Sequence, residues 1–175
     1  MLDFIARLFR KAGASFDTLG IAEVLLNDYA LKIDNLDAIL MNDLSVGDDN
    51  KKMCEHVLIV YKVSLLLLVL LGESGRDKRW KGVCSAIENN LISSSRQPGI
   101  LIEEVNRSMQ TLRNLFGPAI DPANHPPVDT FRWAKVWVKE FGSDEGNPMR
   151  LHCAATHWMR SFIMLTKTAR RIAEQ

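Results

Sequence analysis

The chain has 175 residues, of which 47% are hydrophobic and 25% are charged, with a formal net charge of +1 at pH 7. This balance is typical of one folded domain, and it excludes a low-complexity or repetitive chain. Three scattered cysteines and no secretory signal argue against a disulfide framework, so we expect an intracellular, cytoplasmic protein with reduced thiols.

The N-terminus predicts a short amphipathic helix over residues 2–11. Its apolar side, with Leu8 next to it, is formed by Leu2, Ile5, Phe9 and Ala12, and its cations are Arg7, Arg10 and Lys11. Such a helix can dock on its own bundle, enter a partner's groove or lie on an anionic membrane. We expect docking first, because about eleven residues are marginal for a helix alone in water. A short mitochondrial presequence is a weaker alternative.

Two helices are predicted next. The first begins near Asp17 or Thr18, both good N-cap residues, and should bury Leu19, Ala22, Leu25, Leu26 and Tyr29. The second is capped by Asp34 and should turn inward Leu36, Ile39, Leu40 and Leu44. Residues 46–49 then predict a turn.

The longest apolar run is Val57–Leu71, interrupted by Lys62 and Ser64, within a helix predicted from about Asp49 to Leu71. The run falls short of the roughly 20 residues that span a bilayer, and Lys62 near its middle would be costly in lipid. A helix that is apolar nearly all round is typical of the centre of a bundle. We therefore predict a buried core helix.

The second half of the chain also shows helical spacing. One helix is indicated by Trp80, Val83, Cys84, Ile87 and Leu91, and another should open at Pro98, with an inner face of Ile102, Val105, Met109, Leu112 and Phe116. Residues 117–127 hold four prolines and predict a loop. Helices follow from Asp129 or Thr130 to Phe141 and from Met149 to Ala173. The inner stripe of the last is Leu151, Ala154, Ala155, Trp158, Phe162, Leu165, Ala169 and Ile172.

These elements predict a single all-α domain over residues 1–175. We expect a compact multi-helix bundle of about seven helices around the central buried hydrophobic helix. Strand signals are scarce, because apolar residues recur at helical and not at alternating spacing.

No catalytic motif is present in the sequence. Cys153 and His157, four residues apart, could share a metal ion, with Cys54 and His56 as further candidates. Structural metal sites normally show paired ligands at short spacing, so ordinary packing is the preferred interpretation. We predict no catalytic residue, no metal and no cofactor.

Charge is unevenly distributed. Residues 1–75 hold seven Lys/Arg against eleven Asp/Glu, and residues 76–175 hold fifteen against ten. Basic residues line one side of each of the last two predicted helices. Such faces can bind an acidic protein, an anionic lipid surface or nucleic acid, or can simply be solvated.

The sequence therefore favours a non-enzymatic protein–protein interaction module, acting as an adaptor, a regulator or an assembly subunit. Two alternatives remain open: a peripheral, matrix-like protein on an anionic membrane surface, and a helical nucleic-acid-binding protein. An acidic and a basic part could also meet across two copies in a homo-oligomer. The candidate partner-binding residues are Phe4, Leu8, Arg7, Arg10, Lys11, Arg132, Lys135, Lys139, Arg160, Lys167 and Arg171.

Overall fold

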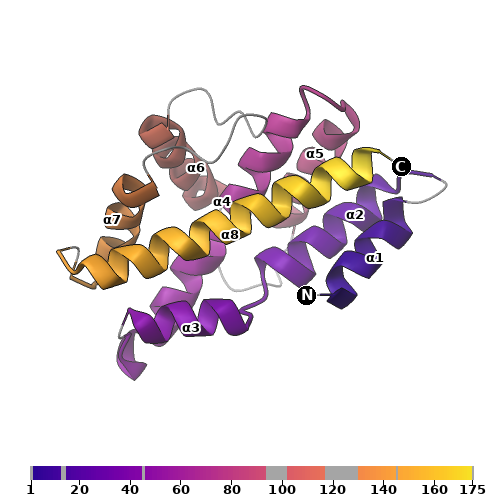
Figure 1. Cartoon of the computed structure of the whole chain (residues 1–175). Helices are drawn as coiled ribbons and strands as arrows, with labels where there is room; N and C mark the ends of the chain where they lie inside the picture. Colours follow the sequence, from indigo (N-terminus) through magenta and orange to yellow (C-terminus); the bar gives the residue numbers. More distant parts are fainter. Residues whose placement is uncertain are drawn as a thin grey trace.

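The computed structural model describes residues 2–12, 15–44, 46–93, 102–116, 130–144 and 146–174. All regular structure in these ranges is helical, and the helices wrap the central helix α4, Lys51–Glu73 (Figure 1). The predicted fold class is confirmed: the chain is an all-α bundle around a buried central helix. The predicted loop at 117–127 and the predicted helix start at Pro98 lie outside the described residues.

The N-terminal part forms α1, Leu2–Ala12, and α2, Thr18–Val24, which continues into the π-helical segment η1, Leu25–Ala30. Asp17 caps α2 by accepting a hydrogen bond from the Gly20 backbone N–H at 2.9 Å. α1 packs against α2, η1 and α8, and Leu8 has none of its surface exposed. The docked arrangement expected for the first helix is therefore confirmed.

A capping box starts α3, Asn35–Asp43. The Asp34 carboxylate accepts from the backbone N–H of Asp37, and the Asp37 carboxylate accepts from the backbone N–H of Asp34. A short 3-10 turn, η2, Asp48–Asn50, then leads into α4. α4 is long and apolar enough to cross a membrane, but 72% of its most apolar stretch is buried inside the bundle, as in the core helix of any large helical domain.

Four helices complete the bundle: α5, Arg79–Ser93; α6, Ile102–Phe116; α7, Thr130–Glu140; and α8, Pro148–Ala173. Asn147 caps α8, with Pro148 at its first position. α8 crosses the whole molecule and packs against α7, α4, α3 and α1, while α5 packs on α2 and α6 on α4 (Figure 1). Elements far apart in sequence therefore meet along α8.

Most predicted core positions are correct, including every residue of the predicted inner stripe of α8. Two predictions are wrong: Leu19 is 72% exposed and Ile39 is 55% exposed. Each of these two residues lies two positions, or about 200° on a helical wheel, from a residue that faces the core in its place. In α2 that residue is Ile21. In α3 it is Asp37, which is only 2% exposed.

Candidate functional site

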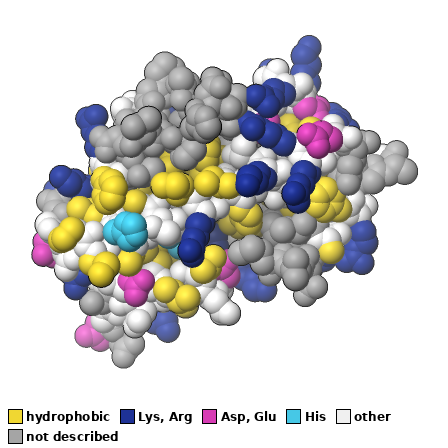
Figure 2. All heavy atoms as spheres, viewed as in Figure 1, with side chains coloured by type: hydrophobic (Ala, Val, Ile, Leu, Met, Phe, Trp, Pro, Cys, Tyr) yellow, Lys and Arg dark blue, Asp and Glu magenta, His cyan; other side chains and the backbone are white. Residues whose placement is uncertain are grey.

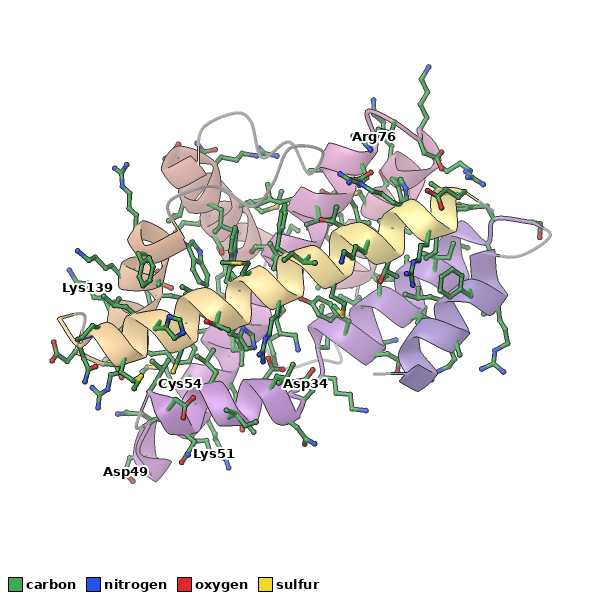
Figure 3. The ribbon with its side chains drawn as sticks, viewed as in Figure 1. Asp34, Asp49, Lys51, Cys54, Arg76 and Lys139 are labelled. Carbon is green, nitrogen blue, oxygen red and sulfur yellow. The ribbon has the colours of Figure 1, made fainter. Side chains whose placement is uncertain are left out.

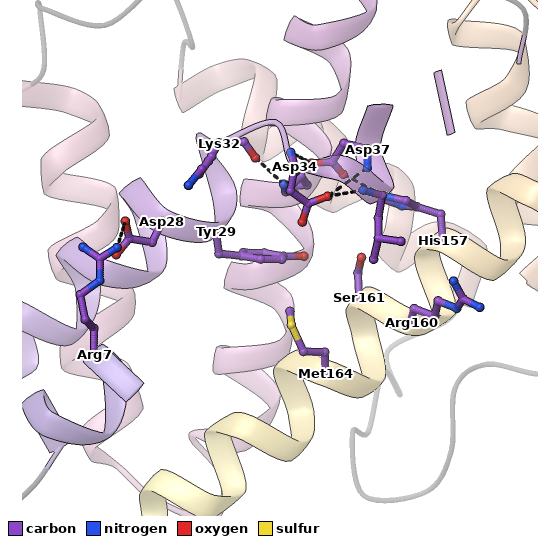
Figure 4. A pocket seen from close by; sticks show the side chains of 12 residues that line it. Arg7, Asp28, Tyr29, Lys32, Asp34, Asp37, His157, Arg160, Ser161 and Met164 are labelled. Carbon is purple, nitrogen blue, oxygen red and sulfur yellow. Dashed lines mark hydrogen bonds and ion pairs between the residues drawn. The ribbon is translucent and has the colours of Figure 1, made fainter. Parts of the chain in front are cut away.

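A cavity of about 380 Å³ opens where η1, α3, α4 and α8 meet, with α1 at its rim (Figure 4). This volume lies within the range of small-molecule sites. Its lining combines charged, hydroxyl and apolar side chains: Arg7, Asp28, Tyr29, Lys32, Asp34, Leu36, Asp37, Lys62, His157, Arg160, Ser161 and Met164. Most of these residues come from elements that the sequence alone does not place together.

The floor of the cavity is a buried ionic cluster of Asp37 from α3, Lys62 from α4 and His157 from α8. Lys62 Nζ donates to Asp37 Oδ2 at 2.6 Å, and His157 Nε2 lies 2.8 Å from Asp37 Oδ1. The three residues are 2%, 1% and 9% exposed. Asp37 therefore ties three helices together at one point.

Lys62 is fully engaged in this cluster. Its ammonium also donates to the backbone carbonyl of Lys32 at 2.7 Å and lies 5.0 Å from the centre of the Tyr29 ring. A buried ammonium is tolerated only where such partners replace water. Lys62 thus fixes the end of η1 and the start of α3 against α4.

The Asp37 carboxyl is ionised at neutral pH. Burial raises its pKa, but the hydrogen bond with His157, the positive charge of Lys62 and the Asp34 backbone N–H outweigh burial, so the pKa lies below its usual range. Because a carboxylate can only accept, His157 Nε2 carries the shared proton. His157 Nδ1 is buried and has no hydrogen-bond partner among the described residues.

The acidic side chains of the cavity wall already have hydrogen-bond partners within the protein. Asp28 pairs with Arg7 at 3.0 Å across the rim, and the Asp34 carboxylate accepts the first N–H groups of α3. By contrast, neither Lys32 nor Arg160 forms an ion pair with any residue in the described part of the chain. Asp34 keeps its negative charge, because backbone N–H groups carry none, so the charges left after pairing are Lys32, Arg160 and Asp34, and their balance is positive.

The wall also carries hydroxyl and apolar groups. The hydroxyl of Tyr29 points toward Ser161, while Leu36 and Met164 add apolar surface (Figure 4). Burial raises the pKa of Tyr29 well above its usual range, so this hydroxyl stays protonated. The cavity offers positive charge, neutral hydrogen-bonding groups and apolar surface together.

A second, smaller cavity of about 160 Å³ lies between α3 and α8. It shares Leu36, His157 and Arg160 with the first cavity, so the two adjoin along the same pair of helices. Its other lining residues are Ile39, Leu40, Asp43, His152, Cys153 and Thr156. Burial and the neighbouring Asp43 raise the pKa of Cys153, which opposes thiolate formation.

The structure places the candidate partner-binding residues of α1 in different settings. Leu8 belongs to the core and is not available to a partner. Arg7 is held at the cavity rim by Asp28, Lys11 pairs with Asp17 at 3.3 Å, and Arg10 is exposed. Phe4 is part of α1, but its side chain lies outside the described part of the structure.

The candidates on α7 and α8 are all exposed: Arg132, Lys135, Lys139, Arg160, Lys167 and Arg171. Figure 3 shows Lys139 pointing away from the bundle. Of the candidates whose side chains the structure describes, only Arg7 and Arg160 line the first cavity. The sequence pattern does not single out Asp37 or Tyr29 as site residues, and its one signal at Lys62 is a charge that interrupts an apolar run.

Cys153 and His157, considered above as a possible metal pair, both line the second cavity but belong to no metal-binding group in the described part of the chain. No group of three or more His, Cys, Asp or Glu residues able to hold a metal occurs among the described residues. His157 is instead bonded to Asp37.

Comparison with known proteins gives no further guide to this site. No family model, curated protein or solved structure matches the chain.

Proposed function

We propose that the protein is a non-enzymatic binding module whose first cavity holds a small organic anion. The observation that supports this most directly is the charge of the cavity wall: Asp28 and Asp37 are paired with Arg7 and Lys62, whereas Lys32 and Arg160 have no described ionic partner and outnumber the one remaining carboxylate, Asp34. A ligand with an acidic group would neutralise these cations, and Leu36 and Met164 would cover its apolar part.

The same contacts favour binding over catalysis. The Lys62 ammonium donates to two oxygens in the floor, so it does not offer a free amine as a nucleophile. His157 points Nε2 at Asp37, and its Nδ1 makes no hydrogen bond to Ser161. The Ser161 hydroxyl is therefore not paired with His157 as a base. Nucleophilic catalysis by a hydroxyl requires such a base. The floor is best explained as a rigid support for the cavity.

A second candidate function is the protein–protein interaction module predicted from the sequence. Arg160, Lys167 and Arg171 are exposed on α8 and form no ion pair with a described residue. Figure 2 shows basic side chains gathered over the second half of α8, and apolar ones around its first half and α3. Such a surface suits an acidic protein partner. Because Leu8 is in the core, the membrane alternative loses part of the apolar face that it needs.

The experiment for the first proposal is a thermal-shift and calorimetry screen of the full chain with small organic acids and their neutral amides. A ligand at about 100 times its Kd stabilises a protein by about 2.7 kcal/mol, which raises Tm by about 5–10 °C at this size. We expect acids, and not their amides, to raise Tm.

Substitution at the cavity provides the matched control. Arg160→Gln should weaken binding about tenfold or more, because it removes a charge-assisted hydrogen bond. Lys139→Gln removes an exposed cation from α7, outside both cavities, and should leave affinity unchanged. Equal binding of acids and amides, or equal loss in both variants, would contradict the proposal.

A further inference from the structure

The second cavity lies directly beside the proposed anion site. Three residues line both cavities, and Arg160 and Leu36 contribute from opposite helices, α8 and α3. The two cavities therefore adjoin, and a ligand that extends from the first into the second would pass these shared residues.

The two cavities differ in charge. Lys32, which has no ion pair with a described residue, lines only the first cavity, Asp43 lines only the second, and Arg160 lines both. An acidic group is therefore attracted to the Lys32 side and repelled from the Asp43 side. The ligand's orientation follows: its acidic head lies in the first cavity and its remainder points toward α3.

Apolar side chains of α3 line one side of the second cavity. Leu36, Ile39 and Leu40 follow one another along α3, and Ile39 is 55% exposed although it is a large hydrophobic residue. The cavity volume of 160 Å³ is close to that of a cavity, about 150 Å³, that holds benzene in another protein. The space therefore suits about six carbons of apolar chain.

We propose that the ligand is a free, linear alkyl acid of medium chain length, with its carboxylate in the first cavity and its chain in the second. This inference rests on the proposed function and adds the chemical class of the ligand. The carboxylate meets Lys32 and Arg160, and the chain passes Leu36 to cover Ile39 and Leu40. Binding would bury the apolar surface that α3 leaves exposed.

The test is calorimetric titration of the full chain with butanoate, hexanoate, octanoate, decanoate and dodecanoate, each below its micelle concentration. Each added methylene that enters the second cavity should tighten binding by up to about fourfold. The gain should stop near about ten carbons, when the cavity is full. Octanol, which has the same chain without the charge, should bind much more weakly than octanoate.

Two variants address the second cavity alone. Thr156→Phe places a ring in it and should abolish the gain with chain length while leaving butanoate affinity unchanged. Ile39→Ser changes an exposed residue that cannot disturb the core, and should reduce the gain for octanoate without affecting butanoate. Together they keep the test valid even if the larger ring prevents folding.

The outcomes separate the two proposals. If no acid of any length binds, the proposed function fails, and this inference fails with it. If short and long acids bind equally well, or if Ile39→Ser leaves the octanoate gain intact, the anion site stands and the alkyl-chain site is overturned. Binding to anionic phospholipid vesicles but not to monomeric acids would also overturn it, because the source would then be a membrane.

Discussion

Replacing Asp37 by alanine provides the sharpest test of the buried cluster. The substitution removes the acceptor shared by Lys62 and His157, and it removes one half of the α3 capping box. The Lys62 ammonium, 1% exposed, then keeps the carbonyl of Lys32 and the Tyr29 ring but has no anionic partner among the described residues. Leaving a buried charge without its partner costs about 3–5 kcal/mol, and loss of the cap adds about 1 kcal/mol. A domain is stable by about 5–15 kcal/mol, so Asp37→Ala should remove about a quarter or more of its stability.

The assay is urea denaturation followed by tryptophan fluorescence, which is sensitive here because Trp133, Trp137 and Trp158 pack together in the core. Lys62→Met should cost less than Asp37→Ala, since the carboxylate that remains keeps its contact with His157. The double variant Asp37→Leu/Lys62→Met replaces the pair by apolar groups and should regain most of the lost stability.

A loss below about 1 kcal/mol in Asp37→Ala would mean that the buried pair does not form. If the double variant is as unstable as Asp37→Ala, the cost does not arise from an uncompensated Lys62 charge. Either result refutes the account of the floor given above.

Acid provides an independent readout of the same carboxylate. The pKa of Asp37 is lowered in the folded protein, so its contribution is fully present above the unfolded pKa of about 3.9 and is lost as pH falls through the folded value. The stability difference between the native chain and Asp37→Ala should therefore be constant near neutral pH and shrink below about pH 4. A difference that instead shrinks between pH 7 and 5 would assign the effect to another group.

Three further predictions concern the rest of the fold. Leu8→Ala should cost about 2–5 kcal/mol in urea denaturation, because Leu8 is fully buried, whereas Leu19→Ala at a 72% exposed position should stay within about 0.5 kcal/mol; equal costs would mean that α1 is not docked. Arg170→Met should destabilise the chain by about 2 kcal/mol, since it leaves the Glu73 carboxylate, 3% exposed, without its 2.9 Å partner; an unchanged urea midpoint would exclude this pair. A thiol reagent should label Cys153 first but slowly at neutral pH, and rapid labelling would contradict its raised pKa.

The fold could be predicted from the sequence because helix packing depends on a repeating pattern. The last helix shows apolar residues at three- and four-residue spacing from Leu151 to Ile172, and all of that stripe is buried. The run Val57–Leu71 is apolar nearly all round, which only a central position satisfies. Local signals such as Asp34 and Asp17 also placed two helix starts correctly.

The site could not be predicted in the same way, because each of its elements contributes only one or two polar residues. Asp37 is 25 residues from Lys62 and 120 residues from His157, and helical periodicity carries no information on such pairings. The apolar pattern even favoured Ile39 over Asp37 as the inward residue of α3. The one local signal was Lys62, a charge within an apolar run, which had to find a buried partner or reach solvent.

The energetics of that partner explain why the cluster and the cavity belong together. A buried ion pair seldom stabilises a fold more than well-packed apolar residues of the same volume, so Asp37 and Lys62 are a poor solution if stability is the sole requirement. They are a good solution for fixing geometry, because a carboxylate that binds an ammonium and an imidazole sets the positions of three helices at once. Two of those helices, α8 and α3, carry Arg160 and Leu36, and the contact of Lys62 with Tyr29 fixes the η1 side of the cavity. A binding site gains affinity when its groups are ordered before the ligand arrives. The cluster of Asp37, Lys62 and His157 orders these groups, and it presents no unneutralised charge to the ligand.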